Sequence, residues 1–465
     1  MVLPHRRVSF ALALTVVAAF CSRPLLTQTN LETNAGVQFN FSTPGAGNLA
    51  LGGAFLALAF DASAAYTNPA GLTTIAAPES LVELRHWNYT HLFTDLGRIA
   101  GQLRTNEGQD RIAGLRDGRA ENRVTGLSFI SYVVPRHRWS YAVYRHELVN
   151  FEADFSSQGA FLERTAEQGI FGIPGERDGR LAALKNRMDV DITAYGGAAA
   201  CRLGQGVSLG LTISYFDFAI DSLAERFRQK PLDQPPQFTD ARLVNRQSQA
   251  GKDSDWGFAA GFLWEGSQGR WSAGGVYRQG PDFALKTRSE AGESPEAVPF
   301  PPVAQTAGFH VPDVWGVGVA FRPSDAFRLA FDYDRISYSE LLRGFVDIFD
   351  LTHLPQIDPA SPKAPDPELN RFEIDDTGEL HLGMEYALLK HWPVLTLRAG
   401  GWYEPDHSLR FEGDNPGFRA VFRQRKDQMH YTAGVGLALR RLQLDAAIDH
   451  SDRASVVALS AGLRY

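Results

Sequence analysis

Apolar and polar residues alternate with a period of two along most of the chain from residue 79 onward. In 442–449, one parity reads Leu, Leu, Ala, Ile and the other reads Gln, Asp, Ala, Asp. The segments 379–386 and 327–334 show the same alternation. Side chains of a β-strand project to opposite faces, so each segment is predicted to be a strand with one apolar face and one polar or small face.

The lengths of these strands and of their connections favour a membrane barrel over a soluble β-sandwich, which would also alternate. Segments such as 207–220, 325–338 and 428–440 exceed the ~5–6 residues of an ordinary strand and suit a tilted bilayer crossing of ~9–11 residues or more. Short and long connections also take turns along the chain. Outer-membrane barrels have this arrangement, with short periplasmic turns and long external loops.

Six short turns and seven longer loops imply fourteen strands, if 79–103 is one long, bent strand. The predicted fold is therefore all-β, a 14-stranded antiparallel transmembrane β-barrel formed by residues 79–465. The short turns are expected at 135–138, 203–206, 265–270, 322–325, 390–392 and 440–441, and the longer loops at 104–122, 156–187, 221–252, 287–311, 339–377, 405–426 and 451–454.

The N-terminus carries the pattern of an export signal. Arg6 and Arg7 precede the apolar run VSFALALTVVAAFC, which is shorter than the ~20 residues of a spanning helix. We expect residues 1–29 to be a removed signal peptide. A lipoprotein signal acylated on Cys21 is the alternative, disfavoured by the bulky Phe20 before it. Without Cys21 only Cys201 remains, so no intramolecular disulfide is expected.

Composition and motifs exclude several classes of function. The chain is 44% hydrophobic and 21% charged, which disfavours disorder, and its net charge of −7 disfavours nucleic acid as a partner. No G-x-S-x-G elbow, HExxH, CxxC or Walker loop is present. The sequence therefore predicts no enzyme, no cofactor and no metal site.

The stretch 45–72, GAGNLALGGAFLALAFDASAAYTNPAGL, is nearly uncharged and rich in Gly and Ala. A barrel of about 14 strands has a lumen too wide for wall side chains alone to fill. We expect residues 30–78 to form an N-terminal hatch that plugs it. Small residues allow close packing against the wall, and the Asn68-Pro69 turn reverses the chain.

The stretch LGGAFLALAFDASAAYTNPAGL resembles the N-terminal signature of the FadL/TodX family of outer-membrane transporters, and VPDVWGVGVAFRPSDAFRLAFDYD resembles the family's mid-barrel hairpin. The resemblance implies a hatch bearing an Asn-Pro-Ala triplet in a 14-stranded barrel, and passive transport of long-chain fatty acids or other hydrophobic compounds. It also implies a sideways exit where an inward kink interrupts the wall. Strand 139–155, with charges in mid-run, is the candidate for that kink.

A similar GGAF…DASA…NPAGL signature opens the PorV-like barrels that serve protein secretion, so a structural or secretion partner is the alternative function. In either case the chain is expected in the bacterial cell outer membrane. The expected partners are hydrophobic small molecules or fatty acids and outer-membrane lipid. The strand 455–465 ends in the aromatic Tyr465 and resembles the signal read by the barrel-assembly machinery.

Three sets of residues are candidates for function. The charges at inward positions either pair across the wall and stabilise the barrel or line a polar path, and Asp61 is either structural, as a helix N-cap, or functional. The hatch motif comprises Gly52, Gly53, Asp61, Asn68, Pro69 and Ala70; the hydrophobic ligand passage comprises Phe55, Leu56, Leu58, Phe60 and Tyr66; the lumen charges are Arg328, Asp332, Glu379, Glu385, Arg398 and Asp445.

Overall fold

The computed structural model describes residues 34, 36–100, 114–163, 178–180, 183–227, 237–266, 268–294, 301–343, 371–413, 419 and 422–465. The expected signal peptide and Cys21 lie outside this part of the chain. Cys201 is a free cysteine. None of the helices formed by the described residues has the length and apolar character that a membrane-spanning helix needs.

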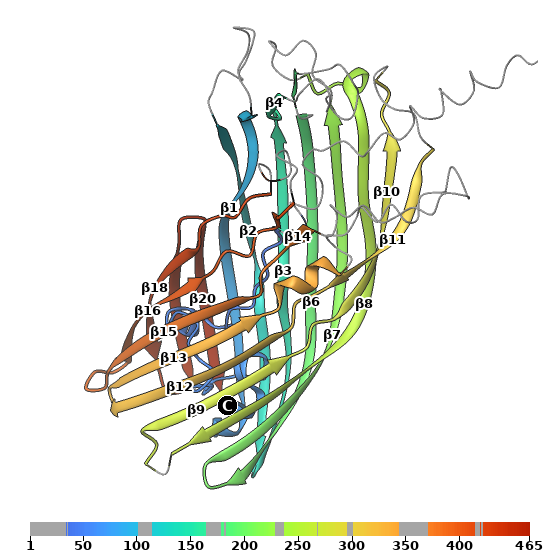
Figure 1. The fold of residues 1–465 in the computed structure, drawn as a ribbon. Helices are drawn as coiled ribbons and strands as arrows, with labels where there is room; N and C mark the ends of the chain where they lie inside the picture. The colour runs from blue at the N-terminus through green and yellow to red at the C-terminus, as the bar shows by residue number, and fades with distance from the viewer. Residues whose placement is uncertain are drawn as a thin grey trace, which may run out of the picture.

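Fourteen strands form one antiparallel wall in the described part of the chain, and the wall closes where β1 pairs with β20 (Figure 1). Two of the fourteen are each divided by a short interruption, one into β9 and β10 and the other into β11 and β12. The predicted 14-stranded barrel is confirmed. The wall elements are β1 (Glu79–Ala100), β2 (Leu115–Arg136), β3 (Trp139–Ser157), β6 (Ala183–Gly204), β7 (Val207–Phe227), β8 (Leu243–Glu265), β9 (Trp271–Arg278), β10 (Asp282–Ala291), β11 (Val303–His310), β12 (Val314–Ser324), β13 (Phe327–Ile336), β15 (Thr377–Leu388), β16 (Val394–Glu404), β18 (Gln428–Ala438), β19 (Leu442–His450) and β20 (Ala454–Arg464).

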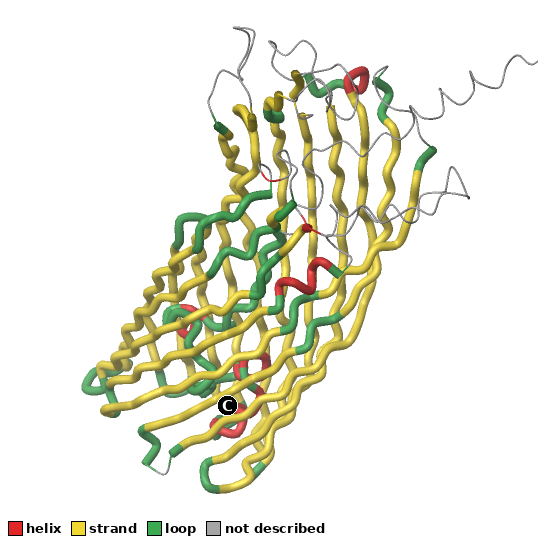
Figure 2. Tube along the Cα trace, in the orientation of Figure 1, coloured by secondary structure: helices red, strands yellow, loops and turns green. Residues whose placement is uncertain are grey.

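The remaining elements are short. The N-terminal helices lie inside the barrel (Figure 2). Of the other two, one lies at the upper end of the drawing and one near its mid-height, both among the connections. The short elements are α3 (Ala46–Leu49), α4 (Ala64–Thr67), η2 (Pro69–Thr74), η4 (Asp240–Arg242) and η5 (Tyr338–Leu342), with the ribbons β4 (Phe161–Glu163) with β5 (Asp178–Arg180) and β14 (Phe372–Glu373) with β17 (Arg410–Phe411).

Several strands are longer than the sequence predicted. β2 begins at Leu115, β6 begins at Ala183, β7 continues to Phe227 and β8 begins at Leu243. The loops are therefore shorter than the predicted ranges 104–122, 156–187 and 221–252. The physical reason is that the strands continue beyond the lipid-facing zone. There the outward residues are polar, and a strand with polar outward residues reads as a loop in the sequence.

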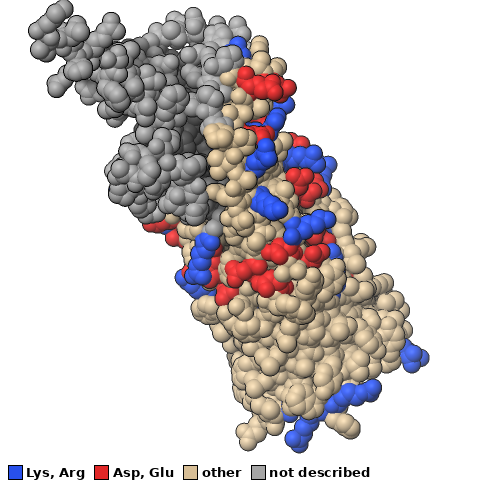
Figure 3. All heavy atoms as spheres, turned by 90° about the vertical axis from the view of Figure 1, so that its right-hand side faces the viewer, with Lys and Arg blue, Asp and Glu red and all other residues tan. Residues whose placement is uncertain are grey.

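A belt of apolar side chains surrounds the lower part of the barrel. On β7 the outward Leu209, Leu211 and Ile213 are 47%, 63% and 61% exposed, while the inward residues between them are small or polar and buried. Leu382 and Met384 on β15 repeat the pattern. Figure 3 shows an uncharged zone between basic groups at the lower end and a dense band of charges above. Such a zone is what a hydrocarbon layer requires of a barrel exterior.

Candidate functional site

The N-terminal segment 43–75 lies inside the barrel and crosses its lumen (Figures 1 and 2). Most of its residues are buried, and Ala54, Phe55, Ala65 and Asn68 are completely inaccessible. Its hydrogen bonds reach strands around the whole wall. The bonded strands include β1, β2, β6, β7, β8, β9, β13, β15, β18 and β20.

Glycines allow this segment to approach the wall at backbone distance. Gly52 has a φ of +68°, and a Cβ added to it would lie 2.8 Å from the amide nitrogen of Gly401 and 2.9 Å from the carbonyl oxygen of Leu382. Gly53, with a φ of +80°, completes the tight bend beside His381. No side chain larger than hydrogen fits at Gly52 without moving the wall.

The wall contributes glycines of its own at the same level, and the sequence analysis missed them. A Cβ on Gly261 of β8 would lie 2.3 Å from Asn68 Oδ1, and one on Gly274 of β9 would lie 2.1 Å from the carbonyl oxygen of Leu56. The sequence signal for such a close approach is a glycine at an inward-facing position of a strand whose other residues alternate between apolar and polar. Gly210, Gly383, Gly400 and Gly434 approach the segment in the same way.

The Asn68-Pro69-Ala70 triplet is a hydrogen-bonded junction between the segment and β8. The Asn68 side chain donates to the carbonyl of Leu56 at 2.8 Å and to the carbonyl of Phe262 at 2.9 Å, and its Oδ1 accepts from the amide of Ala70 at 3.2 Å. Pro69 opens η2, where a missing N–H costs nothing. Asn68 therefore satisfies backbone groups of both the segment and the wall.

Two inward polar residues bind the backbone of the segment, the predicted Asp332 and also His381. Asp332 of β13 is fully buried, and its Oδ2 accepts from the amides of Phe55 at 2.6 Å and Leu56 at 2.7 Å. His381 of β15 contacts the carbonyl of Gly52 through Nδ1 at 2.7 Å. These side chains anchor the bend between them to the wall.

The other lumen charges form ion pairs with one another. Arg398 bridges Glu385 at 2.7 Å and Asp445 at 2.5 Å, and Arg328 contacts Glu385 at 3.3 Å. Glu379 lies 3.5 Å from His381. The arrangement is a network across β13, β15, β16 and β19, in which both arginines and the carboxylates of Glu385 and Asp445 have a partner of opposite sign.

Asp61 turns back onto its own segment. Its carboxylate accepts from the amide of Ser63 at 2.9 Å and from Asn48 Nδ2 at 3.3 Å, beside a cavity of about 40 Å³. Burial, reinforced by the nearby Glu79, raises the pKa of Asp61 to about 6. The proton on this carboxylate is thus coupled to the docking of the segment.

The residues predicted to line a hydrophobic passage occupy two environments. Phe55 and Tyr66 belong to the main apolar cluster of the interior, and Leu58 and Phe60 pack against that cluster. Leu56 instead lies against the wall glycines of β12, with its Cδ1 2.7 Å from where a Cβ on Gly316 would be.

Beyond these residues the interior of the barrel continues as a chain of aromatic rings. Phe39, just before the segment, stacks on Phe41 with a centroid distance of 5.1 Å and lies 6.2 Å from Phe309 of β11. Phe309 lies 5.5 Å from Phe218, which stacks on Phe283 at 4.6 Å. All of these rings except the partly exposed Phe41 are buried on the inner side of the wall, so an apolar solute would meet apolar surface here.

A more polar cavity of about 110 Å³ lies beside this region, between β1 and the connections that follow β16 and β19. Its lining combines four basic residues with two acidic ones. The basic residues are Arg423, Arg425, Lys426 and Arg453, and the acidic ones are Glu404 and Asp406.

The wall is interrupted at β3, the strand that the sequence analysis singled out. The β2–β3 ladder runs only from the pair Phe129–His146 to the pair Arg136–Trp139, although both strands continue beyond it. On its other edge β3 stays paired with β6, with a register shift at Leu148. β3 therefore separates from β2 next to a bulge at Leu148, and the sequence of β3 contains neither Gly nor Pro.

Residue Asn40, ahead of the segment, fills the hydrogen bonds left open at this interruption. Its amide donates to the carbonyl of Leu148 at 2.7 Å, and its side chain donates to the carbonyl of Glu147 at 3.1 Å. Above the bulge, Tyr89 of β1 hydrogen-bonds both backbone groups of Glu152. A cavity of about 20 Å³ between β2 and β3 touches Asn40 and Leu148.

Arg85 of β1 holds this part of the chain in place, and the sequence analysis missed it. The guanidinium is fully buried, and it donates to Asn40 Oδ1 at 2.7 Å, Ser42 Oγ at 2.6 Å and the carbonyl of Thr43 at 2.9 Å. Its Nε pairs with the buried Glu83 at 2.9 Å. The sequence carried one signal for this pair. Glu83 and Arg85 have opposite charges, lie two residues apart on the first strand and therefore share its inward face.

Comparison with known proteins identifies the fold. No protein-family model and no curated protein matches the chain. Among solved structures, a Pseudomonas aeruginosa FadL homologue superposes with a TM-score of 0.59 at 14% identity, covering 92% of this chain and 99% of its own. The monoaromatic hydrocarbon channel CymD gives 0.53 at 15% identity, and the Ralstonia pickettii toluene transporter TbuX gives 0.52 at 12% identity, each with coverages of 92% and 99%.

These superpositions extend over nearly the whole length of both chains. The chain therefore has the FadL/TodX-family fold.

Proposed function

We propose that this protein is a passive outer-membrane transporter for hydrophobic compounds, with long-chain fatty acids among its solutes. The observation that carries the proposal is a lumen filled by a docked segment next to a continuous aromatic interior. The apolar belt on the exterior supports a place in a lipid bilayer. The similar structures named as FadL, CymD and TbuX support the solute class.

In this proposal residues 30–78 act as the hatch. A solute enters among the aromatic rings around Phe39 and Phe309, where burial of its apolar surface stabilises it by ~25 cal/mol per Å². It advances when the segment 36–43 moves away from the bulge at Leu148. No energy source is needed, because the solute partitions down its own gradient.

The proposed exit is the interruption between β2 and β3. Asn40 closes it with two hydrogen bonds, and Arg85 fixes Asn40. Movement of this short stretch would therefore leave the Glu147 and Leu148 carbonyls unpaired and open a path beside them. The path leads sideways into lipid, where an apolar molecule has a lower free energy than in water.

Uptake of radiolabelled oleate and of toluene into proteoliposomes tests the proposal. The purified chain should accelerate entry of at least one of them without accelerating entry of glucose. Heat-denatured protein in matched liposomes is the control. Equal uptake with native and denatured protein would overturn the transport function, and copurification of stoichiometric protein partners would then favour the secretion role.

A further inference from the structure

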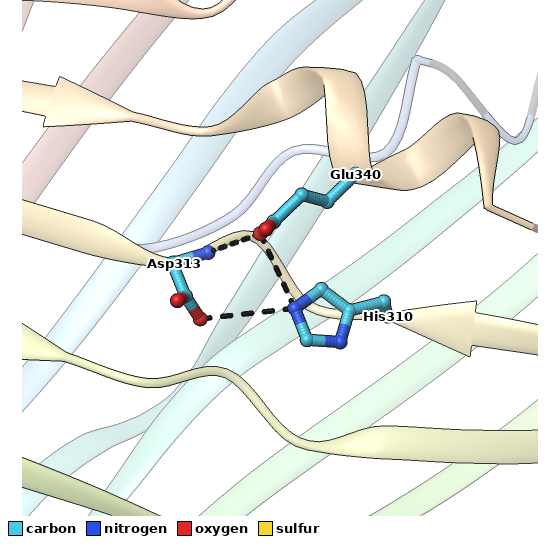
Figure 4. Close-up of side chains that lie close together, drawn as sticks. All are labelled: His310, Asp313 and Glu340. Carbon is cyan, nitrogen blue, oxygen red and sulfur yellow. Dashed lines mark hydrogen bonds and ion pairs between the residues drawn. The ribbon is translucent and has the colours of Figure 1, made fainter.

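Three side chains with metal-binding atoms meet where two wall strands are interrupted (Figure 4). His310 ends β11, Asp313 lies in the break before β12, and Glu340 belongs to η5. His310 Nε2 is 3.7 Å from Asp313 Oδ1 and 3.2 Å from Glu340 Oε2. Bonds of ~2.0–2.1 Å at tetrahedral angles would put neighbouring ligand atoms about 3.4 Å apart, which these spacings bracket.

The imidazole is oriented as metal-binding histidines are. His310 Nδ1 lies 2.7 Å from Asp282 Oδ1, so the carboxylate can accept the Nδ1 proton and leave the Nε2 lone pair facing Asp313 and Glu340. Nε2 is itself buried, and in the described part of the chain it has no hydrogen-bond partner. A buried nitrogen that is close to two carboxylates but bonds neither is suited to an ion between them.

Both carboxylates are held by hydrogen bonds of their own. Asp313 accepts from the hydroxyl of Tyr277 at 2.6 Å and from the amide of Gly280 at 2.9 Å, while Glu340 Oε2 accepts from the amide of Asp313 at 2.9 Å. Such supporting bonds orient metal ligands in proteins. The side chains of Asp313 and Glu340 are 22% and 13% exposed, which leaves a path for an ion from solvent.

The charge of the cluster also favours a dication. Three carboxylates, those of Asp282, Asp313 and Glu340, surround one imidazole. The neighbouring cation Arg343 lies 3.6 Å from Glu340 Oε1, the oxygen that does not contact the histidine, and its side chain is 70% exposed. An exposed arginine offsets little of this negative charge.

We propose that His310, Asp313 and Glu340 bind a divalent transition-metal ion of the Zn²⁺ class, with a water molecule in the fourth position. One imidazole and two carboxylates form a donor set that suits zinc, with Asp282 as the positioning residue. The ion would join β11, the β11–β12 break and η5, bracing the wall where its strands are divided. His310 directly follows Phe309 of the proposed path, but none of the three ligands is one of its rings, and metal binding is measured without any solute, so the site is tested independently of the proposed function.

The test is a titration of the tag-free full-length chain, in detergent, with Co²⁺ as a spectroscopic probe. We expect one equivalent to bind with visible d–d absorption and Zn²⁺ to displace it, whereas Mg²⁺ and Ca²⁺ do not. His310→Gln and Glu340→Gln should each weaken binding at least 100-fold. Asp282→Asn should keep the spectrum but weaken affinity by ~10–100-fold, because the ligands themselves remain.

His391→Gln, in an exposed short turn, is the matched control and should leave the titration unchanged. Heat-dependent electrophoretic mobility establishes that every variant retains the folded barrel. Failure of the folded wild-type chain to bind Co²⁺ stoichiometrically would overturn the site. Undiminished binding by folded His310→Gln, or displacement by Ca²⁺ as readily as by Zn²⁺, would overturn it as well.

Discussion

Replacement of Arg85 by Met tests how the chain around Asn40 is held against the wall. Methionine has an unbranched side chain of similar length to the aliphatic part of arginine, but it lacks the guanidinium. Three hydrogen bonds to residues 40–43 are lost, at 2.6–2.9 Å, and the carboxylate of Glu83 loses its partner. Both side chains are buried, so solvent does not replace what is lost.

The magnitude follows from these contacts. Removing one partner of a buried ion pair costs about 3–5 kcal/mol, because the other charge is left uncompensated. Since about 1.4 kcal/mol corresponds to a factor of ten, we expect the population with residues 40–43 undocked to rise by about two to four orders of magnitude. Glu83→Gln combined with Arg85→Met removes the stranded charge and should recover about 1–3 kcal/mol of this loss.

Hydrogen exchange followed by mass spectrometry is the assay, on peptides covering 36–48. The amide of Asn40, which donates to Leu148, should lose protection in Arg85→Met and regain part of it in the double variant. Peptides from β19 and β20 serve as internal controls. Unchanged exchange at 36–48 in Arg85→Met, or a double variant that exchanges faster than the single one, would refute the reasoning.

Three further predictions concern the same segment. Asn68→Ala should weaken docking of the segment by about 2–4 kcal/mol, because the carbonyls of Leu56 and Phe262 lose their donor. Asn68→Asp should weaken docking more, because it places an acceptor against those carbonyls. Hydrogen exchange at 55–72 measures both effects, and equal protection of the Ala and Asp variants would contradict the donor role. Gly261→Ala should displace the segment, because its Cβ would lie 2.3 Å from Asn68 Oδ1. Gly275→Ala should not displace it, because its Cβ would come no closer than 3.5 Å to another atom. Equal hydrogen exchange in the two variants would contradict the close approach. The pKa of Asp61 is raised to about 6 when the segment is docked, so the docked state binds more protons than the undocked state. The free energy of docking should therefore weaken as pH rises from 3.8 through 6, by about 1.4 kcal/mol between pH 5 and 7.5. Asp61→Asn should abolish this pH dependence, and a wild-type chain without any pH dependence would count against the coupling.

The sequence predicted the barrel well because the lipid belt imposes a strict alternation. β7 and β15 were recognisable from Leu, Ile and Met on one parity alone. Above the belt the outward residues become polar, as Asp221 and Glu225 are on β7, so the sequence beyond Ile220 predicts a loop although the strand continues to Phe227. The limits of the strands were therefore predicted only where a bilayer constrains them.

The site was predicted less completely, because contacts between distant segments determine it. The Asn68-Pro69-Ala70 turn could be singled out from local composition, but its bond to Phe262 could not. Gly261 and Arg85 depend on what lies opposite them in space. His310 and Glu340 are brought together only by the fold, so no motif marked them.

The central claim is that the N-terminal segment closes the barrel, and conductance of planar bilayers tests it most directly. The full-length chain should insert as a barrel with little steady ion current, and a variant lacking residues 45–72 should give stable, ion-permeable channels. Equal current from the two folded proteins would contradict the claim.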